Sequence, residues 1–189
     1  MTDATFGSDG ERRLQEQLDT EERAEKFYET SMKSALTDRM KEFVGERIMF
    51  FLATADADGE TDCSPRIGPP GFVTVLDDEH LCYPEYKGNG VHASLGNMRE
   101  NPNATLTFVD WWDTTLGLHV NGRTELRDEI PEATDHRNEE VTKVWVVLEV
   151  EEAYIHCAKH IPKLRVEEFD PPWGTDDDEA KKTGYFTGE

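Results

Sequence analysis

From residue 46 onward, short apolar runs alternate along the chain with clusters of turn-forming residues. This is the pattern of strands joined by tight turns in an antiparallel sheet. The first run is continuously apolar from Ile48 to Leu52, as in a strand that is buried on both faces. Hairpin turns are indicated at 56–59 and 77–80. The pattern predicts about seven strands, at 47–55, 61–67, 72–76, 80–84, 104–112, 116–126 and 141–154.

Helical patterns precede and interrupt these strands. Ser8 and Glu11 have the spacing of a capping box, so one helix is predicted to begin there and to continue over 11–35. Thr37 is expected to cap a second helix, which leads into the first strand. A short helix is predicted at 91–100, between the fourth and fifth strands.

Strands at this spacing, nearly all joined by short turns, indicate a mainly β fold, namely a small antiparallel β-barrel with flanking helices. The Asn121-Gly122 pair within the sixth strand predicts a bulge or a bend. We expect three parts along the chain. They are an N-terminal helical extension over 1–45, a barrel domain over 46–166, and an acidic C-terminal tail over 167–189.

Acidic residues outnumber basic ones by 41 to 20, so the formal net charge is −21. Proteins that bind nucleic acids hold the phosphates with clustered Lys and Arg, so this balance excludes a general nucleic-acid-binding function. No apolar run approaches the length of a membrane span and no signal peptide is evident, which predicts a cytoplasmic protein without a membrane partner. The acid excess leaves two interpretations open, a strongly solvated surface or halophilic adaptation to a salty cytoplasm.

The cysteines argue against a disulfide-stabilised fold. Cys63, Cys82 and Cys157 are odd in number and far apart in the sequence, and no C-x-x-C motif is present. Such a set is typical of a protein kept in a reducing compartment.

The candidate binding chemistry lies in a polar stretch between the predicted strands and the short helix. Arg66, Lys87, Asn89 and Ser94 are residue types that hold phosphate groups, and Asn97 lies one helical turn beyond Ser94. Gly-Asn-Gly is also ordinary turn chemistry, so a purely structural role for this stretch stays open. No G-x-G-x-x-G or P-loop motif is present. We interpret the stretch as a site for a phosphorylated ligand.

Two other kinds of site have weaker support. His156, Cys157 and His160 are metal-ligating types, but no second Cys/His pair lies near them in the sequence, so no metal is predicted. A hydrolase needs an activated nucleophile, and neither Cys63 nor Ser64 lies in a G-x-S-x-G motif.

Several segments also match the pattern of a known family. They are FLATADADGETDCSPRIGPPGFV from residue 51, LCYPEYKGNGVHASLGNMRENP from residue 81, LHVNGRTEL from residue 118 and AYIHCAKHIPKL from residue 153. In this order, they resemble the pyridoxamine 5′-phosphate oxidase-like family with its FMN-binding split barrel. Within that family, the chain is most similar to the branch of predicted flavin-nucleotide-binding proteins.

The resemblance implies a six-stranded antiparallel split barrel of the FMN-binding type. It also implies a homodimer with flavin sites at the interface between the subunits. Ser64, Pro65 and Arg66 match positions beside the isoalloxazine ring or the ribityl chain. Lys87 and Asn89 match positions that contact the phosphate.

Further site residues follow from the same resemblance. Ser94 and Asn97 lie in the matching helix motif, and both are expected to contact the cofactor. His156 and Lys159 lie in the C-terminal motif, on the expected substrate side of the flavin.

These expectations define a function. We predict an FMN-dependent oxidoreductase that acts on a small molecule by hydride transfer through flavin N5, with no catalytic side chain identified. The vitamin B6 oxidase grips its substrate phosphate with basic and aromatic residues near the C-terminus. Residues 176–179 of this chain are all acidic, so pyridoxamine phosphate is not the expected substrate. The alternative is a non-catalytic carrier or sensor of FMN or haem.

Overall fold

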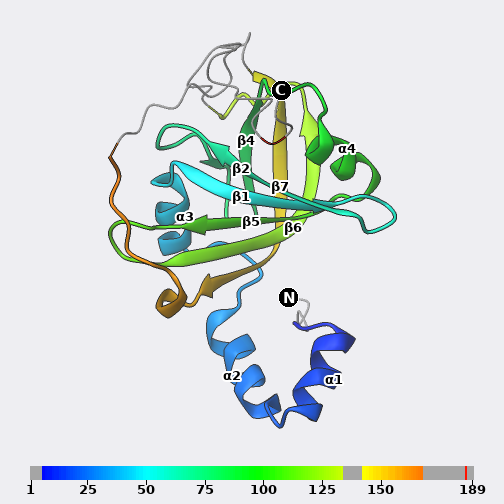
Figure 1. Ribbon diagram of the computed structural model, residues 1–189, viewed down its shortest axis with the longest axis vertical. Coiled ribbons are helices and arrows are strands. Elements are labelled where there is room, and N and C mark those ends of the chain that lie inside the picture. The colour runs from blue at the N-terminus through cyan, green and yellow to red at the C-terminus, as the bar shows by residue number, and fades with distance from the viewer. Residues whose placement is uncertain (1–5, 134–141, 168–185, 187–189) are drawn as a thin grey trace.

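The computed structural model describes residues 6–133, 142–167 and 186. Its body is a seven-stranded sheet in the order β2-β1-β5-β6-β7-β4-β3, and every pair of neighbours is antiparallel. The sheet curls around the main core (Figure 1), which confirms the predicted mainly β barrel, although it has seven strands and not the six that the family resemblance implies. The strands are β1 (Met49–Ala55), β2 (Thr61–Ile67), β3 (Thr74–Val75), β4 (His80–Tyr86), β5 (Asn103–Val109), β6 (Gly117–Arg127) and β7 (Thr142–His156).

The helices lie outside this sheet. They are α1 (Asp9–Gln17), α2 (Glu21–Ser31), α3 (Asp38–Gly45), α4 (Ala93–Glu100) and the short 3-10 helix η1 (Ala158–His160). Thr37 caps α3 as predicted, because its side chain accepts a hydrogen bond from the Met40 amide. α3 buries Val44 completely in the barrel core, and α4 lies over β1 and β6.

Alternation of buried and half-buried residues along β1 builds the centre of the core. The Phe50 ring lies 5.8 Å from that of Phe72, 4.9 Å from Tyr83 and 5.3 Å from Phe108, measured between centroids. These rings come from β1, the segment before β3, β4 and β5, so they join both ends of the sheet. Gly68 is required beside them, because a Cβ there would lie 2.3 Å from the Phe72 side chain.

Backbone pairing does not close the barrel. β2 pairs only with β1, and β3 pairs only with Leu81 and Cys82 of β4. The half of β4 that begins at Tyr83 therefore has no strand on that side among the described residues. The free edges of β2 and β4 face each other across a split, which an ion pair between Arg66 and Glu85 bridges.

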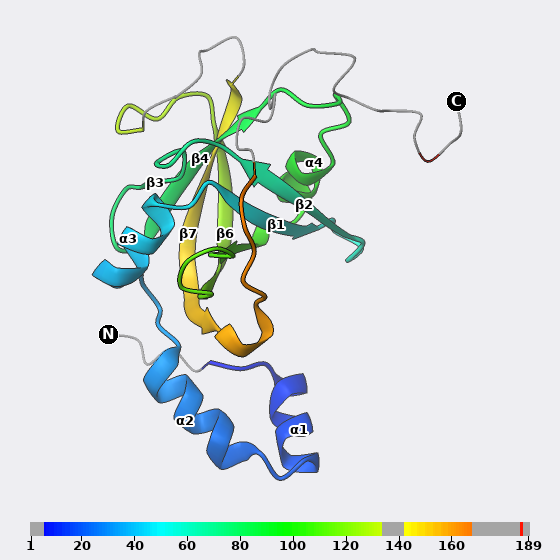
Figure 2. The ribbon, with the colours of Figure 1, turned by 60° about the vertical axis from the view of Figure 1, so that its left-hand side comes forward.

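The first two helices, α1 and α2, form an arm that lies away from the barrel (Figures 1 and 2). The prediction of one helix over 11–35 is wrong, because the chain turns after α1 at Asp19, whose φ is 53°. Asp enters this left-handed region more readily than most residues and so can end a helix. The predicted capping box is present, with Ser8 and Glu11 each bonding the other's backbone amide.

The arm is attached to the barrel at β7. Lys33 and Ala153 exchange two backbone hydrogen bonds, of 2.9 and 2.7 Å. The ring of Phe27 meets that of Tyr154 edge-on, with centroids 6.0 Å apart. Tyr28 is buried, and its hydroxyl accepts a hydrogen bond of 2.7 Å from Gln15, which ties α1 to α2.

Some strand limits differ from the predicted ones. The strand predicted at 72–76 shortens to β3 because Phe72 and Val73 turn into the core. β5 ends at Val109, because the Asp110 carboxylate accepts bonds from three backbone amides of the turn that follows. The bulge at Asn121-Gly122 is confirmed by a register shift in the pairing of β6 with β7.

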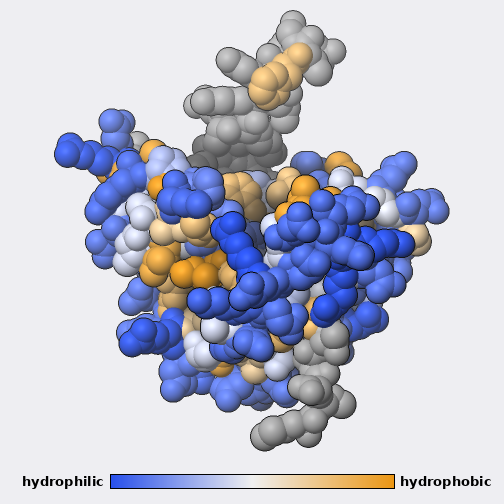
Figure 3. Space-filling view, turned by 90° about the horizontal axis from the view of Figure 1, so that it is seen from below, coloured by the Kyte–Doolittle hydropathy of each residue, from blue (hydrophilic) through white to orange (hydrophobic). Residues whose placement is uncertain are grey.

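The predicted tail lies outside the described residues except for residues 167 and 186, and so does the predicted start of the last strand at 141. The molecular face in Figure 3 is mostly hydrophilic, as the net charge of −21 leads one to expect. Among the described residues, no helix has the length and apolar character needed to cross a membrane.

The bulge in the pairing of β6 with β7, whose extra residue is Glu151 of β7, allows a test of this packing. A Cβ at Gly122 would lie 1.9 Å from the Glu149 carbonyl oxygen, a backbone atom of β7. Because backbone cannot swing aside, we expect Gly122→Ala to lower the free energy of unfolding by about 3 kcal/mol, at the upper end of overpacking costs. Urea denaturation measures this difference.

Gly96→Ala in the interior of α4 is the matched control, since a Cβ there meets nothing within 4 Å. We expect this variant to gain about 0.5–1 kcal/mol, because Ala favours helix over Gly. Equal stabilities of the two variants would contradict the packing described for β6 and β7.

Candidate functional site

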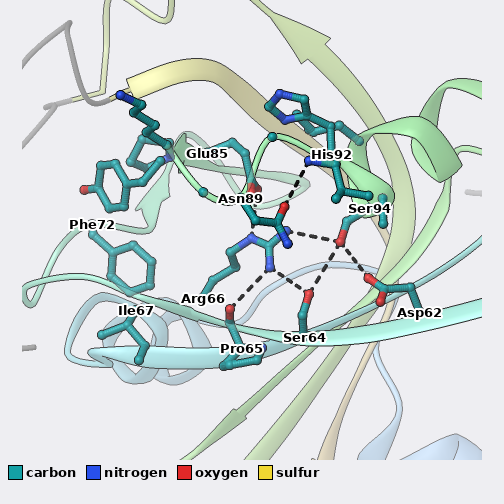
Figure 4. Close-up of a pocket in the computed structure, with 18 residues that line it drawn as sticks. Asp62, Ser64, Pro65, Arg66, Ile67, Phe72, Glu85, Asn89, His92 and Ser94 are labelled. Carbon is teal, nitrogen blue, oxygen red and sulfur yellow. Dashed lines mark hydrogen bonds and ion pairs between the residues drawn. The ribbon is translucent and has the colours of Figure 1, made fainter. Parts of the chain in front are cut away.

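A cavity of about 390 Å³ lies at the split between β2 and β4. Its walls come from the inner face of β2, the end of β4, the loop 87–92 and the first turn of α4 (Figure 4). The loop and helix follow directly after β4, so the topology that leaves the barrel split also places polar residues around the opening.

The alternation of β2 decides which side chains reach the cavity. Asp62, Ser64 and Arg66 are half-buried on one face of the strand, whereas Cys63 and Pro65 are exposed on the other. The pairing of Phe50 with Arg66 on β1 and β2 fixes this register. Three polar side chains thus line one wall, at a spacing of two residues.

Arg66 is the centre of a hydrogen-bonded network (Figure 4). Its Nε donates to Glu85 Oε2 at 2.8 Å, and its Nη1 donates to Ser64 Oγ at 2.8 Å. Nη1 also donates to the Pro65 carbonyl at 3.2 Å, and Nη2 donates to Ser94 Oγ at 3.2 Å. The guanidinium is therefore fixed from β2, β4 and α4 together.

Ser94 connects α4 to this network. Its hydroxyl donates to Asp62 Oδ2 at 2.8 Å and lies 3.4 Å from Ser64 Oγ. Ser94 is buried in the first turn of α4, and His92 before it adopts a left-handed φ of 57°. The N-terminus of α4 therefore opens at the cavity, where its unpaired amides favour an anion.

The loop between β4 and α4 is held by its own polar groups. Asn89 Oδ1 accepts a hydrogen bond of 3.0 Å from the Val91 amide. Gly90 has a φ of 82°, which favours glycine, and a Cβ at Gly88 or Gly90 would meet nothing within 4 Å. The backbone of this loop is accordingly open to a ligand.

Positive and negative groups are balanced in the cavity wall. Asp62 and Glu85 provide two carboxyl groups, and Arg66 and Lys87 provide two cations. Burial raises the pKa of Glu85, and the charge of Arg66 and the hydrogen bond from it offset part of that rise. The site suits a ligand with anionic and hydrogen-bonding groups.

Comparison with known proteins identifies the family. The sequence profile of the family described as pyridoxamine 5′-phosphate oxidase matches residues 36–170, which is more than half of the 189 residues. The chain belongs to the pyridoxamine 5′-phosphate oxidase family. The family implied by the sequence motifs is thereby confirmed. No curated protein sequence matches the chain.

Comparison with solved structures finds similar chains at low sequence identity, and the first of those named here has the same fold. A Lactobacillus delbrueckii protein assigned as a pyridoxamine 5′-phosphate oxidase is 23% identical with a TM-score of 0.50, over 66% of this chain and 99% of that one. HupZ of Group A Streptococcus is 22% identical with a TM-score of 0.48, over 64% and 93%. HutZ, the heme storage protein of Vibrio cholerae, is 15% identical with a TM-score of 0.41, over 64% and 93%.

The structure brings most of the predicted cofactor-binding residues of this family member into one cavity. Those that line it are Ser64, Pro65, Arg66, Lys87, Asn89 and Ser94. The residues of β2 and those of the following loop and helix lie more than twenty positions apart in the sequence, and the fold brings them together at the split between β2 and β4. Their role toward a flavin stays a prediction.

The other predicted site residues do not line this cavity. Asn97 lies on α4, where its amide donates to Thr54 Oγ1 of β1 at 3.1 Å. His156 ends β7, with Nδ1 2.9 Å from Nε2 of His119. Lys159 is exposed in η1. None of these three residues therefore lines the cavity of its own chain.

Sequence reasoning missed two carboxyl groups of the cavity. Asp62 shares the inner face of β2 with Ser64 and Arg66, so strict alternation along the strand predicts its position. The predicted strand ends at Pro84, whereas β4 continues to Tyr86, and this continuation places Glu85 in the cavity wall. Proline is compatible with an edge strand, and that possibility was the available signal.

The described residues contain no group of three or more His, Cys, Asp or Glu side chains arranged to hold a metal ion. Cys63, Cys82 and Cys157 are all unpaired.

Proposed function

We propose that the protein is an FMN-binding flavoprotein, and that it works as an oxidoreductase on a small molecule by hydride transfer through flavin N5. The observation that carries this proposal is the convergence of Arg66, Ser64 and Ser94 at the split of a barrel in this family. Charge-assisted donors next to a helix N-terminus are what a phosphate ester requires.

The residues present are compatible with FMN. A cavity of about 390 Å³ lies within the range of small-molecule sites. Phe72, Ile67 and Leu95 also line the cavity and give it apolar character for a ring system. The open backbone at Gly88 and Gly90 allows close approach of a polar chain.

In this proposal, Lys87 and Asn89 hold the phosphate, as the family resemblance implies, with Ser94 and Asn97 supporting them from α4. We assign Arg66 to the phosphate as well, although the resemblance places it beside the ring or the ribityl chain, because its guanidinium lies next to Ser94 at the start of α4. Ser64 and Pro65 lie beside the ring or the ribityl chain. A bound FMN supplies the hydride acceptor or donor at N5, and the protein supplies orientation and charge. Arg66 is the cation placed to favour negative charge on the cofactor.

Arg66 gives the sharpest test of flavin binding. We expect the freshly purified protein in high salt to show a flavin absorption spectrum and to release FMN on heating. Arg66→Ala should weaken FMN binding at least about tenfold, because a hydrogen bond to a charged group is worth about 1.5–3 kcal/mol. Fluorescence titration of the apoprotein with FMN measures the dissociation constants.

Arg123→Ala is the matched control, since Arg123 is an exposed arginine of β6 that does not line the cavity. It should bind FMN as the wild type does. The double variant Arg66→Ala, Glu85→Gln separates binding from folding, because it leaves no unpaired buried carboxylate. Unchanged FMN affinity in both Arg66 variants would sink the proposed role of this residue.

A non-catalytic carrier or sensor of FMN or haem is the competing function. Steady-state consumption of a nicotinamide donor by the holoprotein separates the two, and we expect turnover. A released haem in place of FMN would favour the carrier, and a colourless protein that takes up no added FMN would remove the proposed function.

We also propose a homodimer in which the partner subunit completes the cavity. Val91 supports this arrangement, because it is an apolar side chain on the cavity wall and is 72% exposed. His156 and Lys159 do not line the cavity of their own chain, so a substrate-side role for them requires a second copy.

Light scattering after size exclusion should give a mass of about twice 21.6 kDa. Val91→Asp should shift the protein toward monomer and weaken FMN retention together, because it places a charge in an apolar contact. Leu18→Asp is the control, since Leu18 is 62% exposed but lies on the arm. A monomer that retains FMN fully would contradict the shared site.

A further inference from the structure

Protein acceptors already occupy the guanidinium of Arg66. Nε, Nη1 and Nη2 each donate to an acceptor within the chain, at distances between 2.8 and 3.2 Å. Four of the five N–H groups of the guanidinium are used in this way, and one remains on Nη2. An incoming phosphate that binds Arg66 through two N–H groups must therefore replace at least one of these acceptors or share a donor with it.

Glu85 differs from the other acceptors because it carries a full charge. Ser64 and Ser94 offer neutral hydroxyls, and Pro65 offers a carbonyl. Asp62 accepts from Ser94, and no ion pair between Asp62 and Arg66 is formed. Glu85 is thus the carboxylate that occupies the position of a ligand anion.

The surroundings of Glu85 favour retention of this pair in the absence of a ligand. The side chains of Arg66 and Glu85 are 17% and 14% exposed, so both are largely removed from water. The described charged and titratable groups around Glu85 come from several elements, namely Arg66 and Asp62 of β2, Tyr83 of β4, Lys87 of the loop and His92 before α4.

A phosphate ester that binds Arg66 through two N–H groups competes with ionised Glu85 for the guanidinium. Two like charges in a partly buried site disfavour each other, so a bound phosphate favours the protonated form of Glu85. Protonated Glu85 keeps its place in the wall, because its carbonyl oxygen still accepts a hydrogen bond from Arg66.

We propose that Glu85 is an internal competitor of the ligand phosphate at Arg66, and that binding of a flavin phosphate is coupled to protonation of Glu85. This inference rests on the proposed function and adds its regulation by pH. Burial already raises the pKa of this carboxyl in the free protein. A nearby phosphate raises that pKa further, so the bound state holds more protons than the free state.

The sign of the effect follows from this linkage. Because the pKa of Glu85 is higher in the complex than in the free protein, FMN affinity falls as the pH rises between the two values. Each pH unit in that window changes the dissociation constant by at most about tenfold. The second ionisation of the phosphate, near pH 6, strengthens the charge with rising pH and is common to all variants.

The test is a titration of the apoprotein with FMN between pH 5.5 and 8.5, for the wild type and for Glu85→Gln. We expect the wild-type dissociation constant to rise with pH relative to that of Glu85→Gln, by at most about tenfold per pH unit, and Glu85→Gln to bind more tightly at pH 8.5. Calorimetry in buffers of different ionisation enthalpy should show more proton uptake by the wild type than by Glu85→Gln.

Asp62→Asn is the matched control, because it removes the other carboxylate of the cavity without touching the pair at Arg66. It should keep the wild-type pH dependence. Riboflavin, which lacks the phosphate, should bind with no dependence on Glu85. Thermal unfolding of each variant verifies the fold.

The outcomes are distinguishable. Failure of every variant to bind FMN overturns the proposed function and the inference with it. FMN binding with the same pH dependence in the wild type and Glu85→Gln overturns the inference alone. Weaker binding by Glu85→Gln at every pH also overturns it, since Glu85 would then only orient Arg66.

Discussion

The barrel depends on the way in which its two free edges meet. β2 and β4 approach each other without sharing a backbone hydrogen bond, and an ion pair of 2.8 Å spans them. Pro65 on β2 and Pro84 on β4 each lack an amide donor, so both edges are poorly suited to pair with another strand. Because these edges do not pair, a cavity remains between β2 and β4. The aromatic core around Phe50 holds the strands on both sides of it together.

The strands and the polar stretch could be predicted because both follow local patterns. The apolar run of β1, the turns and the irregularity at Asn121-Gly122 are all visible in neighbouring residues of the sequence. The break at Asp19 and the two-residue length of β3 could not be predicted, because left-handed conformation and core burial depend on the tertiary structure. The role of Glu85 in the site could not be predicted either, because it depends on Arg66, which lies nineteen positions away in the sequence.

The candidate site also shows how a very acidic protein can hold an anionic ligand. Its net charge is −21, yet the cavity wall has equal numbers of carboxyl and basic groups. Short hydrogen bonds and a helix N-terminus act on the ligand directly. Salt screens the charges spread over the surface, with a Debye length of about 10 Å at 0.1 M ionic strength and about 3 Å at 1 M. The site is therefore insulated from the overall charge of the molecule.

The attachment of the N-terminal arm has a consequence for the solubility of the fold. β7 has 15 residues and continues past the end of β4, which pairs with it only from Glu149 to Thr142. The edge that this leaves beyond Val150 would be a template for strand addition by another molecule. Lys33 occupies it through both backbone bonds to Ala153. The residues that follow the arm thus cover part of this edge with backbone of the same chain, which is one of the ways in which proteins protect an edge strand.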